Sequence, residues 1–117
     1  MGLDMYIQDE DGQQIAYWRK FNALHKWFVD NIQDGIDNCQ VSRRLTKDDI
    51  QNIVYVLREV EKNPATAPEM LPTSSGFFFG DVTYNDWFLQ DVMRSIPIFE
   101  GLLERVERDK LYYQSSW

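Results

Sequence analysis

The stretch Trp18-Arg-Lys-Phe-Asn-Ala-Leu-His-Lys-Trp-Phe-Val-Asp-Asn-Ile32 decides the fold class of this chain. Projected at about 100° per residue, its apolar side chains fall on one continuous arc, as in a helix that packs one face against a core. The arc comprises Trp18, Phe21, Leu24, His25, Phe28, Val29 and Ile32. The pattern therefore predicts an amphipathic helix over 18–32.

Two further helices are expected on either side of a proline-rich segment. Thr46 is followed three residues later by Asp49, a capping-box arrangement, and apolar residues then repeat at helical spacing as far as Lys62. Thr83 or Asn85 is suited to cap a third helix, whose apolar residues continue to Val106. Together with the first, these make three expected helices.

Short strands are expected at both ends and within one aromatic run. Residues 3–8 alternate apolar and polar, Asp11-Gly12 is a hairpin signal, and 14–17 suits the returning strand. Gly76-Phe-Phe-Phe-Gly80 is too short for a helix and favours a strand. The β-favouring residues 111–114 are expected to form a last strand that pairs with the first one.

Length and composition indicate one domain. The 117 residues, of which 44% are hydrophobic, suffice for a single core. We therefore expect one α+β domain over 1–117, with three helices packed on a small mixed β-sheet.

The acidic composition limits the partners. With a formal net charge of -7, the chain repels phosphate backbones and anionic lipid, so we expect no direct nucleic-acid contact and no membrane association. An acidic protein can instead occupy a cationic channel by imitating phosphate charge. Cys39 is the one cysteine, so no intrachain disulfide forms, and a cytoplasmic location is expected.

His25, the one histidine, lies inside the apolar arc of the first helix. It is either a core histidine with a hydrogen-bond partner or a group that faces a pocket as acid, base or ligand contact. The small-molecule hypothesis depends on the second alternative, in which the imidazole and the neighbouring Asn22 amide face an open hollow.

Polar residues at the border of the same arc suit an anion. Arg19 and Lys26 combine a planar fork with a point charge, although such residues often only pair with carboxylates at the surface. In the loop before the aromatic run, Ser74 and Ser75 carry hydroxyls without the spacing of a phosphate-binding P-loop. The complete candidate ligand-binding set is Trp18, Arg19, Asn22, His25, Lys26, Ser74, Ser75 and Phe77. No metal-binding motif stands out, and we expect neither a metal nor a cofactor.

Four segments resemble a family of small phage and prophage proteins. They are Met1-Gly-Leu-Asp-Met-Tyr6, Tyr17-Trp-Arg-Lys-Phe-Asn-Ala-Leu-His-Lys-Trp-Phe28, Leu71-Pro-Thr-Ser-Ser-Gly-Phe-Phe-Phe-Gly80 and Tyr112-Tyr-Gln-Ser-Ser-Trp117. The resemblance implies an accessory protein in the cytosol of a host bacterium and transfers no catalytic residue to this chain. Some members of that family carry a phosphoglycerate kinase label, for which this chain is too short.

Three functional hypotheses follow. The first is an accessory protein that binds and sequesters a small anionic, nucleotide-like ligand and so modulates host defence. The second is an acidic inhibitor that docks on a host defence protein or nuclease. The third, least supported, is a small hydrolase or transferase that uses His25. A homo-oligomer is compatible with the excess of aromatic residues.

Overall fold

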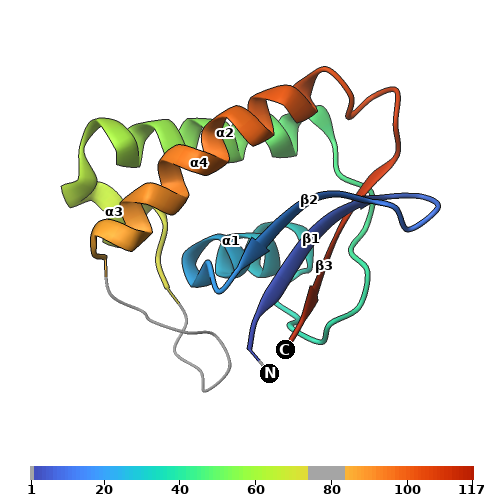
Figure 1. Cartoon of the computed structure of the whole chain (residues 1–117), viewed down its shortest axis with the longest axis horizontal. Helices are drawn as coiled ribbons and strands as arrows, with labels where there is room; N and C mark the ends of the chain where they lie inside the picture. The colour runs from blue at the N-terminus through green and yellow to red at the C-terminus, as the bar shows by residue number, and fades with distance from the viewer. Residues whose placement is uncertain (1, 74–83) are drawn as a thin grey trace.

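The computed structural model describes residues 2–73 and 84–117 and shows an α+β fold. A three-stranded sheet consists of β1 (Asp4–Asp9), β2 (Gln14–Arg19) and β3 (Leu111–Ser116). The helices are α1 (Asn22–Ile32), α2 (Lys47–Lys62), the short α3 (Ala67–Met70) and α4 (Asp86–Leu103), with a 3-10 turn over Pro64–Thr66. Figure 1 shows α1 beside the sheet, and α2 and α4 packed side by side across one side of the molecule.

The sheet has the strand order β2-β1-β3, and both pairings are antiparallel. The prediction that the last strand pairs with the first is confirmed by the register Asp4 opposite Ser116. The expected mixed sheet is wrong for the described residues, because β1 and β2 form a hairpin and β3 returns beside β1 without a parallel crossover. The strand predicted over 76–80 lies outside the described residues.

The first helix is shorter than its periodicity suggests. Trp18 and Arg19 belong to β2, where they pair with Met5 and Asp4, and the helix begins only at Asn22. Strand alternation buries Trp18 and exposes Arg19. Pairing with β1 outweighs the local helical pattern over these two residues.

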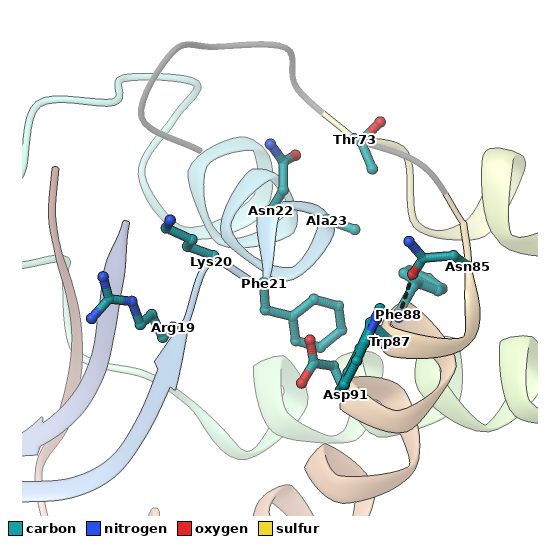
Figure 2. A pocket seen from close by; sticks show the side chains of 10 residues that line it. All are labelled: Arg19, Lys20, Phe21, Asn22, Ala23, Thr73, Asn85, Trp87, Phe88 and Asp91. Atoms are coloured by element: carbon teal, nitrogen blue, oxygen red, sulfur yellow. Dashed lines mark hydrogen bonds between the residues drawn. The ribbon is translucent and has the colours of Figure 1, made fainter. Parts of the chain in front are cut away.

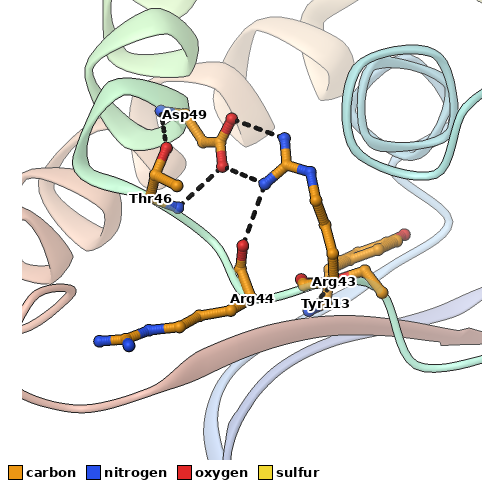
Figure 3. Close-up of polar contacts among 6 residues, drawn as sticks. Arg43, Arg44, Thr46, Asp49 and Tyr113 are labelled. Carbon is orange, nitrogen blue, oxygen red and sulfur yellow. Dashed lines mark hydrogen bonds and ion pairs between the residues drawn. The ribbon is translucent and has the colours of Figure 1, made fainter.

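The remaining helix signals agree well with the structure. Thr46 and Asp49 form the expected reciprocal capping box, and Arg43 adds two hydrogen bonds to the Asp49 carboxylate, as Figure 3 shows. Asn85 caps α4 through a hydrogen bond from the Phe88 N–H to Oδ1. The short helix α3 was not expected, because the prolines around it indicate a loop. It can form because Pro68 lies in its first turn, where a proline is tolerated.

The core lies between one face of the sheet and the helices. Its largest fully buried side chains include Trp18, Phe28, Phe99 and Tyr113. Trp18 stacks on Phe99 with ring centroids 5.1 Å apart, and Phe28 stacks on Tyr113 at 3.9 Å. These contacts join the sheet to α1 and α4.

Candidate functional site

A cavity of about 260 Å³ opens where the end of β2 and the start of α1 face the first turns of α4 (Figure 2). This volume lies near the lower limit of typical small-molecule pockets. The lining residues are Arg19, Lys20, Phe21, Asn22, Ala23, Thr73, Asn85, Trp87, Phe88 and Asp91.

A sharp change of backbone direction forms one wall of the cavity. Lys20 has a φ of 55°, in the left-handed region that a residue with a side chain rarely adopts. This single residue carries the chain from β2 to the N-cap of α1, Phe21, which has no side-chain acceptor for the first N–H groups of the helix. The junction therefore brings Arg19 and Lys20 next to the positive end of the α1 dipole.

Arg19 and Lys20 are two neighbouring cations without an ion pair in the part of the chain that the structure describes. Most other Lys and Arg side chains of this acidic protein do form one. Both residues are exposed, and their charged ends lie at the outer edge of the cavity, close to Gly2. Figure 2 shows both side chains directed away from Phe21 and Asp91. Together they provide a site to which an anion can bind.

The opposite wall is an aromatic and carboxylate surface of α4. Trp87 is 74% exposed, the most exposed of the large apolar side chains described. Asp91 lies one turn further along the same helix, and Figure 2 shows its carboxylate on the side of the cavity where the Phe21 ring lies. A flat ring on the indole and a polar group on the carboxylate would both be accommodated here.

Asp91 has few hydrogen-bond donors. Burial raises the pKa of its carboxyl group, and this effect outweighs the opposing influence of Arg94, whose Nη2 lies 3.4 Å from Oδ1. Additional N–H donors would stabilise the ionised form of this partly buried carboxylate, because a carboxylate can only accept hydrogen bonds.

The two walls are joined through the core. Trp18 Nε1 donates a 2.8 Å hydrogen bond to Ser95 Oγ, and Ser95 Oγ donates one of 2.6 Å to the Asp91 carbonyl. Trp18 thus supports the cavity from behind without lining it. Trp18, a candidate ligand contact in the sequence analysis, is fully buried and does not line this cavity.

His25 lies in the core and does not line the cavity between the β2–α1 junction and α4. Its side chain is 1% exposed, with Nδ1 2.7 Å from the Tyr113 hydroxyl and Nε2 3.0 Å from Asp37 Oδ2. Because the Asp37 carboxylate only accepts, Nε2 carries the hydrogen, and in the neutral ring Nδ1 accepts from Tyr113. Of the two alternatives for His25, the geometry matches the core histidine. The condition on which the sequence-based small-molecule hypothesis depended, an imidazole facing an open hollow, is therefore not met, and any ligand site must depend on other residues.

The other candidate residues are divided between the cavity and the surface. Arg19 and Asn22 line the cavity, whereas Lys26 points elsewhere and forms a 2.6 Å ion pair with Asp30 one turn along α1. Ser74, Ser75 and Phe77 lie outside the described residues.

Sequence reasoning missed Lys20, Trp87 and Asp91. Lys20 lay on the polar side of a helical projection that does not apply at this point, because the strand continues to Arg19. Trp87 and Asp91 lie in the first two turns of α4, 65 or more positions from Asn22, and only the packing of α4 brings them to the same cavity.

Over residues 2–73 and 84–117, no cluster of three metal-ligating side chains occurs, and none of the helices has the length and apolar character needed to cross a membrane. Comparison with protein-family models, with curated proteins and with solved structures finds no match to this chain. Functional inference therefore depends on the geometry of the site itself.

Proposed function

We propose that this protein binds a small anionic, nucleotide-like ligand in the cavity between the β2–α1 junction and α4. The observation that carries the proposal is the pair Arg19 and Lys20, which lacks carboxylate partners among the described residues although the protein has excess carboxylates. The exposed Trp87 on the facing wall provides a surface for a ring. An anion and a ring are the two parts of a nucleotide.

The ligand's acidic part would lie toward Arg19, Lys20 and the start of α1. There, two positive side chains and the helix dipole act in the same direction, which offsets the repulsion of an anion by the net charge of -7. The ring would lie toward Trp87 and Phe88. This arrangement differs from the one expected from sequence, in which His25 and Lys26 were also to contact the ligand.

The same site favours sequestration over turnover. The imidazole of His25, the residue expected to act as acid or base, is enclosed in the core and does not line this cavity. In the phage setting that the sequence resemblance implies, retention of a host nucleotide signal would modulate host defence. Ligand recovered unchanged after heat denaturation of the complex would support this part of the proposal.

Thermal melting in the presence of nucleotides and inorganic phosphate tests the binding. A ligand at about 100 times its Kd adds about 2.7 kcal/mol to the free energy of unfolding, a shift of several degrees for a domain of this size. The double variant Arg19→Gln/Lys20→Gln is expected to lose the shift. The matched control Lys47→Gln/Lys62→Gln removes the same charge from α2 and is expected to keep it.

Two results would contradict the proposal. One is the absence of a shift with every nucleotide and with phosphate. The other is equal loss of the shift in both double variants, because the shift would then depend on the net charge of the protein and not on the cations at the cavity.

Docking on a basic partner protein is a second candidate, favoured by two exposed apolar residues outside the cavity. Tyr55 on α2 is 59% exposed and Met93 on α4 is 52% exposed. Such residues can anchor a partner while the negative charge attracts it. A partner that is lost on Met93→Glu but retained by Arg19→Gln/Lys20→Gln would favour this candidate.

A further inference from the structure

The cavity has opposite polarity at its two walls. Arg19 and Lys20 are positive at the β2–α1 junction, whereas Asp91 is the one carboxylate among the described lining residues and lies on α4. A ligand that fits must therefore be anionic at one end and must donate hydrogen bonds at the other. This requirement goes beyond a preference for anions.

The chemistry of Asp91 restricts the donor end. Its carboxylate accepts through two oxygens, and Oδ1 accepts a long hydrogen bond of 3.4 Å from Arg94 Nη2. Two parallel N–H groups on a planar ligand would satisfy both oxygens at once. Trp87, 74% exposed, lines the same cavity and is an aromatic surface on which a planar group can stack.

Among the common nucleobases, guanine alone presents two adjacent donors, N1–H and N2–H, on its pairing edge. Adenine places the N1 acceptor beside its amino group, so a carboxylate there meets one donor and one lone pair. Uracil flanks its single N3–H by two carbonyl oxygens. A carboxylate as the base-reading group therefore discriminates in favour of guanine.

We propose that the ligand is a guanine mononucleotide, with its phosphate at Arg19 and Lys20 and the N1–H and N2–H edge of its base on the Asp91 carboxylate. This inference rests on the proposed function and specifies the substrate class of the same site. The cavity volume of about 260 Å³ is small for a ligand pocket, so the inference is restricted to a single nucleotide. Burial raises the pKa of the Asp91 carboxyl group. Two N–H donors from the bound base would stabilise the carboxylate and so lower that pKa.

Titration calorimetry with GMP, IMP and AMP tests the inference. IMP keeps N1–H but lacks the N2 amino group, so the expected order of affinity is GMP, then IMP, then AMP. Loss of a bidentate contact to a base lowers affinity by about ten- to a hundred-fold. Asp91→Asn is expected to lower GMP affinity by this factor and to leave AMP affinity within about three-fold.

Asp48→Asn is the matched control, because Asp48 is an exposed carboxylate in the first turn of α2, away from the cavity. It removes the same charge and is expected to leave the order of affinities unchanged. Melting temperatures of both variants without ligand verify that each is folded. A second readout is the pKa of Asp91 measured by carboxyl NMR, which is expected to fall when GMP binds.

The outcomes separate this inference from the proposed function. If GMP, IMP and AMP bind equally well, or if Asp91→Asn leaves the preference for GMP intact, the guanine assignment is overturned while ligand binding stands. If none of the three nucleotides binds and phosphate does not bind either, both proposals fail together.

Discussion

The indole Nε1 of Trp18 and the hydroxyl of Ser95 form a buried 2.8 Å hydrogen bond across 77 positions of sequence. It connects β2, which ends at the cations of the cavity, to α4, which carries the opposite wall. The same hydroxyl donates to the Asp91 carbonyl. Ser95 is therefore hydrogen-bonded both to Trp18 of β2 and to the backbone of Asp91, a lining residue of α4. The relative position of the two walls thus depends on the Trp18–Ser95 hydrogen bond, although neither residue lines the cavity.

Ser95→Ala is expected to lower the free energy of unfolding by about 1–3 kcal/mol, because it leaves the buried Trp18 N–H without its acceptor. Urea denaturation measures this loss. In a double-mutant cycle with Trp18→Phe, the two losses are expected to be strongly non-additive. Additive losses would show that the hydrogen bond itself contributes little.

His25→Gln separates the core function of the imidazole from a ligand-binding one. The change disturbs the hydrogen bonds to Tyr113 and Asp37, so we expect a loss of about 2–3 kcal/mol in the free energy of unfolding. Affinity for a nucleotide that binds the wild type is expected to change less than about three-fold, within 0.7 kcal/mol or so. A large loss of affinity in a variant of near-normal stability would show that His25 contributes directly to ligand binding.

Lys26→Gln tests a residue that the sequence pattern and the structure treat differently. Its ammonium is paired with Asp30 at the surface of α1, and such exposed pairs contribute about 0.5 kcal/mol or less. Lys20→Gln is therefore expected to weaken ligand binding far more than Lys26→Gln does. Equal effects in calorimetry would argue that the ligand extends along α1 instead of toward α4.

Gly2→Ala is expected to displace the Lys20 side chain without removing its charge. A Cβ at Gly2 would lie 2.8 Å from Lys20 Cε, and the φ of 127° adds backbone strain of about 1–2 kcal/mol. Gly12→Ala is the matched control, since its φ is also positive while nothing lies within 4 Å of the added methyl group. Both variants should lose stability, and only Gly2→Ala should change ligand affinity in calorimetry.

The Asp49 capping site predicts a pH dependence of stability. Burial alone would raise the pKa of the Asp49 carboxyl group, but hydrogen bonds from Arg43 and from the Thr46 N–H outweigh it and lower that pKa below the ordinary value of 3.8. The interaction therefore stabilises the protein above pH 3.8 and is lost as the pH falls through the lower folded-state value.

Asp49→Asn is accordingly expected to cost about 1–2 kcal/mol near pH 7, from the lost cap and the lost pair with the half-exposed Arg43. The difference from wild type should begin to shrink below pH 3.8, where the unfolded chain takes up the proton, and should vanish once the pH falls below the lower pKa of Asp49 in the folded protein. Chemical denaturation across this pH range measures both values. A difference that stays constant with pH would contradict an ionic contribution.

Local patterns in the sequence were sufficient for the α+β class, for the Thr46–Asp49 cap and for Asn85 as one of two candidate caps of α4, and the pairing of the terminal strands was also expected. The class and the caps depend on residues within a few positions or on the period of a single element. The strand pairing was expected from the β-favouring residues at both ends of the chain, although it joins residues as far apart as Asp4 and Ser116. Local patterns were insufficient at Trp18 and Arg19, where the helical arc suggested one structure and pairing with β1 imposed another. Tertiary contacts routinely override a local preference of this kind.

By itself, the sequence determined which side chains face the core and which charges are available, since periodicity and residue type decide both. Only the tertiary structure decided that His25 is enclosed between Tyr113 and Asp37, and that Arg19 and Lys20 share a cavity with Trp87 and Asp91. The reason is physical: a cavity forms between elements, and its lining depends on how α4 packs against the β2–α1 junction over a separation that no local pattern spans.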